Sequence, residues 1–83
     1  MRFNILLILF LSFFSICNSQ TAFELEKQGN SKFEKKDYKG AIADYTKAIE
    51  INSGKASVYI NRGIAKAKLK DYKGAIADYT KAI

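Results

Sequence analysis

The stretch DYKGAIADYTKAI occupies residues 37–49 and occurs again, without a change, at residues 71–83. Thirteen identical residues whose two copies start 34 positions apart form an internal repeat, because chance does not produce such a match. The segments before the two copies align more loosely at the same offset, with Gly29 opposite Gly63. A period of 34 residues predicts a fold built from stacked copies of one small helical unit.

Within the repeated stretch the apolar residues follow the period of an α-helix. In the first copy they fall at relative positions 0, 3, 4, 7, 10 and 11, which is the spacing of one helix face. They are Tyr38, Ala41, Ile42, Tyr45, Ala48 and Ile49. Asp37 and Asp71 stand immediately before the two stripes, where a carboxylate can cap a helix by accepting a backbone N–H. Residues 52–54, Asn-Ser-Gly, predict the break between the repeats.

The part of the chain from residue 20 to residue 83 is predicted to be all-α. We expect helices over residues 22–35, 38–51, 56–69 and 72–83, since no segment there shows the alternating period of a strand. Thr21 and Glu24 have the spacing of a capping box at the start of the first helix. The helices would form two tandem helix-turn-helix hairpins, with repeat one at about 22–55 and an incomplete repeat two at about 56–83.

A period of 34 residues with this helical pattern resembles the tetratricopeptide repeat family. Each repeat has a glycine, an Ala-x3-Tyr step and a second alanine at the family's places. These residues are Gly29, Ala41, Tyr45 and Ala48, then Gly63, Ala75, Tyr79 and Ala82. Lys32 and Lys66 depart from the family, which has Tyr at that position, and the chain has no Pro. The resemblance covers residues 22–83 and implies a short right-handed α-solenoid in which the matching residues pack the hairpins together.

The same resemblance implies a groove. Proteins of this family bind peptides in a concave face lined by the first helix of each hairpin. The corresponding residues here are Phe23, Glu26, Asn30, Phe33, Glu34, Ile60, Asn61, Ile64 and Lys68. The family's pocket for a C-terminal carboxylate uses Lys and Asn side chains, and Asn30 and Asn61 match two of those asparagines. Glu26 stands where the Lys should be and would repel a carboxylate, so we do not expect that mode of binding.

The residue types needed for most catalysis are missing. The chain has no His, and its one Cys, Cys17, lies in the N-terminal apolar segment. The five glycines are dispersed, so no phosphate-binding loop is predicted. Asp44 and Asp78 recur at equivalent places, and we expect them to be solvated on the surface. The sequence therefore predicts no enzyme, no catalytic residue, no metal site and no cofactor.

The positive charge is concentrated near the predicted hairpin turns. The formal net charge is +6, and lysines cluster at residues 35–39 and 68–73. Such a rim could attract acidic proteins, anionic lipid or polyanionic polymer, although lysines on turns are usually only solvated. Arg62 is the only arginine after residue 2, so an aromatic-and-arginine platform for nucleic acid is not expected.

Residues 1–19 have the three-part pattern of a secretory signal peptide. Arg2 precedes an apolar block over residues 5–16, and small polar residues follow it. We expect cleavage after Ser19, which leaves Gln20 at the N-terminus of an exported, periplasmic or secreted protein. An uncleaved anchor is the alternative and would be the only contact with a membrane, while acylation of Cys17 is disfavoured because Ile16 precedes it.

The repeats and the missing catalytic residue types predict a protein–protein interaction module that binds a peptide or a partner helix. The alternative is a structural or self-assembly spacer of a larger envelope or secreted protein. Repeat arrays usually need about three units and a polar cap, so the last helix would leave Ile76 and Tyr79 uncovered. We expect either that this chain is a fragment of a longer array or that it self-associates through the open C-terminal helix.

Overall fold

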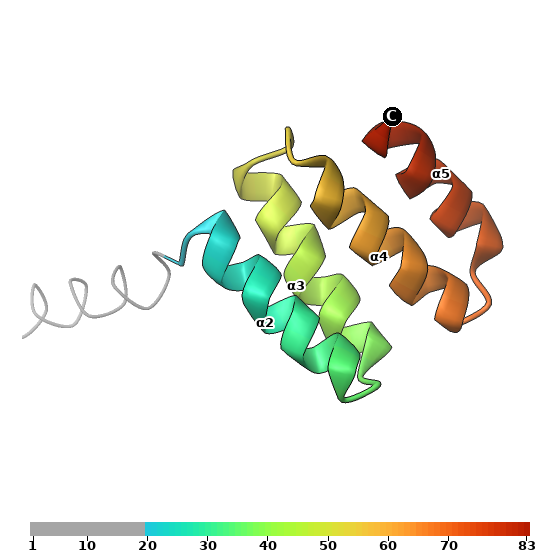
Figure 1. The fold of residues 1–83 in the computed structure, drawn as a ribbon, viewed down its shortest axis with the longest axis horizontal. Helices are drawn as coiled ribbons and strands as arrows, with labels where there is room; N and C mark the ends of the chain where they lie inside the picture. The colour runs from blue at the N-terminus through green and yellow to red at the C-terminus, as the bar shows by residue number, and fades with distance from the viewer. Residues whose placement is uncertain (1–19) are drawn as a thin grey trace, which may run out of the picture.

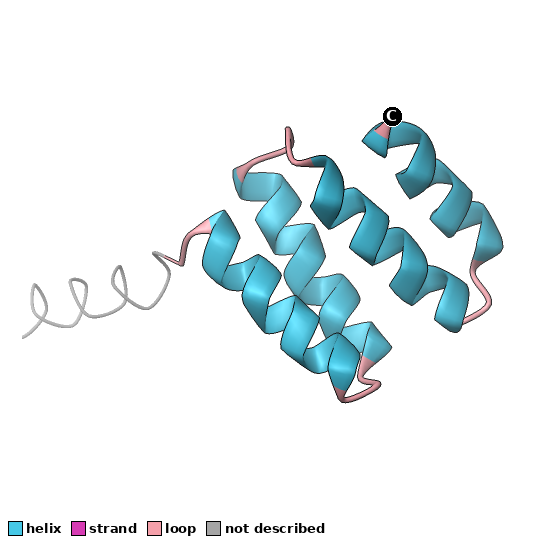
Figure 2. Cartoon of the chain, in the orientation of Figure 1, coloured by secondary structure: helices cyan, strands magenta, loops and turns pink. Residues whose placement is uncertain are grey.

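The structure, a computed structural model, describes residues 20–83. It contains four helices, which are α2 (Ala22–Glu34), α3 (Tyr38–Ile51), α4 (Ala56–Lys68) and α5 (Tyr72–Ala82). The four predicted helices are confirmed, with three of them ending one residue earlier than expected. Figure 2 shows only helices and connecting loops over these residues. The predicted signal segment, including its last residue Ser19, lies outside the described residues.

The helices form two hairpins that lie side by side. The turn at residues 35–37 joins α2 to α3, and the turn at residues 69–71 joins α4 to α5. Each helix packs against its neighbour in the chain (Figure 1). The helices α2 and α4 are also in contact. Among the described helices α5 contacts only α4. This arrangement confirms the predicted all-α solenoid of tandem hairpins.

The helix starts use the caps that the sequence predicts. The Asp37 carboxylate accepts a hydrogen bond from the backbone N–H of Gly40 at 3.0 Å, and Asp71 does the same for Gly74. Thr21 Oγ1 accepts from the N–H of Glu24 at 3.1 Å, which is the threonine half of the predicted capping box. These bonds satisfy backbone donors that the first helical turn leaves unpaired.

Both hairpin turns use a left-handed residue that is not glycine. Lys36 and Lys70 have φ angles of 65° and 67°. At the first turn the N–H of Asp37 bonds to the carbonyl of Lys32 at 2.8 Å, and that of Lys36 bonds to the carbonyl of Phe33 at 2.9 Å. This pair of bonds is a Schellman motif, a helix ending that usually has glycine at the left-handed position. The sequence did not predict it because lysine gives no sign of positive φ.

Replacing Lys36 with glycine should therefore stabilise the chain by about 0.5 kcal/mol. Relief of the left-handed strain is worth about 1–2 kcal/mol, and the greater unfolded-state freedom of glycine offsets about 0.5–1 kcal/mol of it. Urea unfolding followed by circular dichroism would measure the change. The matched control is Lys39→Gly within α3, which should destabilise by up to about 1 kcal/mol. Equal losses from both substitutions would contradict the prediction.

The core lies between the two helices of the first hairpin and the start of the second. Its buried residues are Leu25, Ala41, Tyr45, Ala48 and Val58. Gly29 allows the first hairpin to close, because a Cβ atom there would lie 2.6 Å from Cε1 of Tyr45. Gly63 does the same in the second hairpin, where a Cβ atom would lie 2.7 Å from Cε1 of Tyr79.

Candidate peptide-binding groove

A hollow of about 360 Å³ lies between the first helices of the two hairpins. Its lining comes from α2, α3 and α4 and consists of Asn30, Phe33, Glu34, Tyr45, Asn61 and Ile64. Five of these six were predicted as groove residues. The structure therefore brings together Asn30, Phe33 and Glu34 of α2 with Asn61 and Ile64 of α4. We call this hollow the groove.

The polar side of the groove is organised around Asn30. Its Oδ1 atom accepts a hydrogen bond from the Tyr45 hydroxyl at 2.5 Å and a longer one from Asn61 Nδ2 at 3.4 Å. Burial, followed by the nearby charges of Glu26 and Asp44, raises the pKa of Tyr45 to about 12, so the hydroxyl keeps its proton and donates. The Asn30 amide nitrogen and the Asn61 amide oxygen take no part in these bonds and remain available to a ligand.

Tyr45 was predicted only as a packing residue. Its ring is buried against Gly29, yet its hydroxyl reaches the lining of the groove. The sequence held a signal for this position, since the glycine that faces the Tyr45 ring immediately precedes Asn30. The groove floor is therefore part of the hydrophobic core of the first hairpin.

Glu26 is placed between the hairpins and not in the lining of the groove. Its carboxylate lies 3.1 Å from Lys55 Nζ, and it accepts a hydrogen bond from the Ser57 hydroxyl at 3.3 Å. The residue is buried, so these contacts both neutralise its charge and connect α2 to the start of the second hairpin. Glu26 stands where the family's carboxylate pocket has Lys, and in this chain it connects the two hairpins through Lys55 and Ser57.

Three more predicted groove residues lie outside the lining. Phe23 is exposed near the start of α2, with the Nζ atoms of Lys27 and Lys55 each 5.5 Å from the centre of its ring. Ile60 and Lys68 are exposed on α4. Of the residues in the lining, Phe33 also packs edge-on against Tyr38, with the ring centres 5.2 Å apart.

The prediction that Asp44 and Asp78 are solvated surface residues is wrong. Both are buried, and each pairs with a lysine of the preceding helix. Lys32 Nζ lies 2.9 Å from Asp44 Oδ2, and Lys66 Nζ lies 3.1 Å from Asp78 Oδ2. Lys32 and Lys66, which stand where the family has Tyr, therefore serve as ion-pair partners of these two aspartates. Sequence reasoning missed the pairs because the two members are on different helices.

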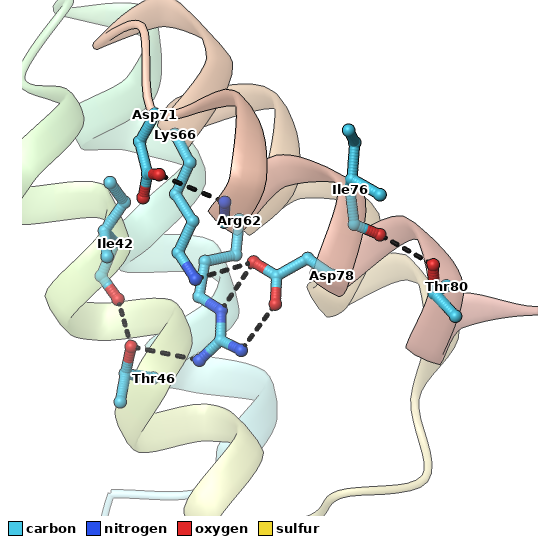
Figure 3. Close-up of polar contacts among 9 residues, drawn as sticks. Ile42, Thr46, Arg62, Lys66, Asp71, Ile76, Asp78 and Thr80 are labelled. Carbon is cyan, nitrogen blue, oxygen red and sulfur yellow. Dashed lines mark hydrogen bonds and ion pairs between the residues drawn. The ribbon is translucent and has the colours of Figure 1, made fainter.

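Asp78 has a second and stronger partner in Arg62 (Figure 3). The guanidinium donates from Nε to Oδ2 at 2.9 Å and from Nη2 to Oδ1 at 2.7 Å, and its Nη1 donates to the Thr46 hydroxyl at 3.2 Å. Burial alone would raise the pKa of Asp78, but the hydrogen bonds and charges of Arg62 and Lys66 outweigh it and lower that pKa. Arg62 thus joins its own hairpin to α3 of the other one.

The part of the chain that the structure describes shows no group of three or more His, Cys, Asp or Glu side chains placed to hold a metal ion. Over residues 20–83 no helix has the length and apolar character needed to cross a bilayer.

Stacked helical hairpins with an amide-lined groove between their first helices define a protein–protein interaction scaffold. The TPR repeat family matches residues 29–70, which is half of the chain. The chain belongs to the tetratricopeptide repeat family, and its general role is that of a protein–protein interaction module.

Similar proteins include serine/threonine-protein phosphatase 5 of Mus musculus, which is 49% identical over 41 residues, or 49% of this chain. The same phosphatase of Homo sapiens is 46% identical over 41 residues. The Protein STIP1 homolog of Dictyostelium discoideum is 40% identical over 45 residues, or 54% of this chain. The match spans only 8% of the length of each of these relatives.

Proposed function

We propose that this chain is an exported module that binds an extended peptide in the groove between α2 and α4. The observation that carries the proposal is the convergence of residues from three helices on one hollow in a tetratricopeptide fold. Binding by such a groove requires no catalytic group. The proposed role is therefore recognition of a partner and not chemistry on it.

The lining suggests how the peptide is recognised. Phe33 and Ile64 offer apolar surface for one side chain of the peptide, and the free amide atoms of Asn30 and Asn61 can pair with its backbone. Glu34 is exposed at the edge and favours a basic residue nearby. The hollow of about 360 Å³ suits a short segment of peptide and not a whole helix.

Selection of binders from a library of random linear peptides, followed by affinity measurement, would test the groove. The double substitution Asn61→Ala with Ile64→Ala should lower the affinity for the selected peptides at least tenfold, which corresponds to about 1.4 kcal/mol. It removes one amide and one apolar side chain from the groove lining. Phe33 is left unchanged, since its packing on Tyr38 would confuse binding with stability.

The matched control for this experiment is Lys47→Ala, an exposed residue of α3 outside the groove. It should leave the affinities unchanged. Circular dichroism of each variant checks that the helices are intact. If the selected peptides bind the double variant as well as the original chain, the groove is not the binding site.

We also propose that residues 1–19 direct export and are removed. The support is the sequence pattern of a charged start, an apolar block and small residues before Gln20. N-terminal sequencing of the protein recovered from outside the cytoplasm should begin at Gln20. Recovery of a soluble chain that still begins with Met1 would contradict cleavage.

A further inference from the structure

The charge of the groove lining is opposite to that of the chain as a whole. The formal net charge of the chain is +6, yet none of the lining residues is Lys or Arg, and one of them, Glu34, is acidic. None of the ion pairs among residues 20–83 includes Glu34, and the residue is exposed. The Glu34 carboxylate is therefore an uncompensated negative charge at the edge of the groove.

Two further features make the groove attractive to a cation. Figure 1 shows α2 and α4 running in the same direction, and they end at Glu34 and Lys68. The carbonyl ends of both helices, which carry partial negative charge, therefore lie at the same end of the groove. At the groove floor, burial is the main cause that raises the pKa of Tyr45 to about 12, and the negative charges of Glu26 and Asp44 add to it. The negative potential thus extends to the Tyr45 hydroxyl.

The lysines on the helices around the groove do not cancel this potential. Lys68 stands on α4 at the position equivalent to Glu34, but it is exposed and does not line the groove. Its ammonium group is on a long flexible stem in water, where salt screens its charge. Lys55 lies 3.1 Å from the Glu26 carboxylate and is neutralised by that contact. The charge that the groove presents to a ligand is therefore negative.

The apolar part of the lining restricts which cation fits. Phe33 and Ile64 line the groove from opposite helices, and both are partly buried. An arginine side chain has an apolar stem that packs on such surface while its charged head stays at the edge. The guanidinium group also packs against aromatic rings and donates two hydrogen bonds to one carboxylate. Arginine therefore matches Phe33, Ile64 and Glu34 together, whereas an aliphatic side chain would leave Glu34 without a partner.

Given the peptide-binding function proposed above, on which this inference rests, we propose that the groove recognises an arginine side chain within an internal segment of a partner protein. The stem of the arginine packs between Phe33 and Ile64, and its guanidinium group donates to the Glu34 carboxylate. The amide nitrogen of Asn30 and the amide oxygen of Asn61 bind the peptide backbone beside it. The preferred charge is opposite to that of a C-terminal carboxylate, for which the family's pocket uses Lys and Asn side chains.

The test measures how strongly the immobilised full chain retains short random peptides. Separate libraries carry arginine, lysine, citrulline or glutamate at a fixed central position, uncharged residues elsewhere, and acetyl and amide caps that remove the terminal charges. Citrulline has nearly the shape of arginine without its charge. Arginine peptides should bind about tenfold more tightly than citrulline peptides, as expected for hydrogen bonds between charged groups. Lysine peptides should fall between the two, because an ammonium group lacks the planar fork, and glutamate peptides should bind least.

Substitutions of Glu34 identify the contact. Glu34→Gln should remove most of the difference between the arginine and citrulline peptides, and Glu34→Lys should make glutamate peptides bind better than arginine peptides. Glu34 is exposed and ends α2, where a negative charge is unfavourable for the helix, so neither change puts folding at risk. The matched control is Glu50→Gln, the same change at an exposed residue of α3 outside the groove, which should leave the preference for arginine unchanged.

A preference for arginine that survives Glu34→Gln would overturn the proposal, because the guanidinium group would then bind elsewhere. Tighter binding of peptides with a free C-terminal carboxylate than of their amidated forms would also overturn it. Equal binding of all libraries would do the same, but the proposed peptide-binding function would stand if Asn61→Ala with Ile64→Ala still weakened that binding. Binding that the double variant leaves unchanged, or no binding at all, would contradict the peptide-binding function as well.

Discussion

Replacement of Tyr45 by alanine should lower the free energy of unfolding by about 4 kcal/mol, the cost of removing a fully buried aromatic side chain. The ring fills the space against Gly29, and its hydroxyl bonds to Asn30 at 2.5 Å. A domain of this size has roughly 3–10 kcal/mol of stability, so the variant should be largely or wholly unfolded at room temperature. Thermal unfolding followed by circular dichroism would measure the loss.

Tyr79→Ala is the matched control, because it removes the same residue from the same place in the second repeat. Tyr79 is 37% exposed, since no described helix covers its side of α5. We expect a loss of about 2 kcal/mol, half or less of the Tyr45 effect. Equal losses at the two positions would contradict the greater burial of Tyr45 as the cause of its larger effect.

The second large effect should come from Asp78→Asn, which we expect to destabilise the chain by about 3 kcal/mol. The side chain of Asp78 is 3% exposed and compensates two positive charges, those of Arg62 and Lys66. Removing its charge leaves both cations facing a neutral amide in a mostly buried place, which is costly. Asp44→Asn is the control and should cost about 1 kcal/mol, because Asp44 has only the 43% exposed Lys32 as a partner.

The ion pairs of Asp78 with Arg62 and Lys66 also predict how stability depends on pH. The pKa of Asp78 is lowered in the folded state, so the unfolded chain binds a proton more readily. Its contribution is fully present above the unfolded pKa of about 3.9 and is lost as the pH falls through the lower folded pKa. Denaturant unfolding across the acid range should show this loss in the original chain and a smaller one in Asp78→Asn. The same acid dependence in both would contradict the role of Asp78.

The elements of the fold were predictable because their determinants are local. The apolar period in residues 38–49 and the caps at Asp37 and Asp71 determine where the helices form. Each of these signals involves only residues within one or two helical turns of one another. The left-handed Lys36 was not predictable, since the strain at that residue is imposed by the closure of the turn. The pairing of Arg62 with Asp78 was also missed, because it depends on how two helices face each other.

The groove was predicted only in part, because its lining also depends on how helices from different hairpins face each other. Family resemblance identified the helices that line it, and five of its six residues follow from that. The resemblance did not reveal that Glu26 turns towards Lys55 and Ser57, because the partners of a charge are set by neighbours from another hairpin. It also did not separate the lining from exposed flanking residues such as Phe23 and Ile60.

The position of Tyr45 couples the stability of the fold to the affinity for a peptide. Its ring belongs to the core, while its hydroxyl holds the asparagine that we expect a peptide to contact. A peptide that changes the position of the Asn30 side chain also acts on Tyr45, which is hydrogen-bonded to Asn30. Tyr45 is the residue whose removal should unfold the hairpin. Any ligand that binds only the folded chain raises its melting temperature. Here the reverse also applies, because a substitution that loosens the first hairpin should reduce affinity even when it touches no part of the ligand.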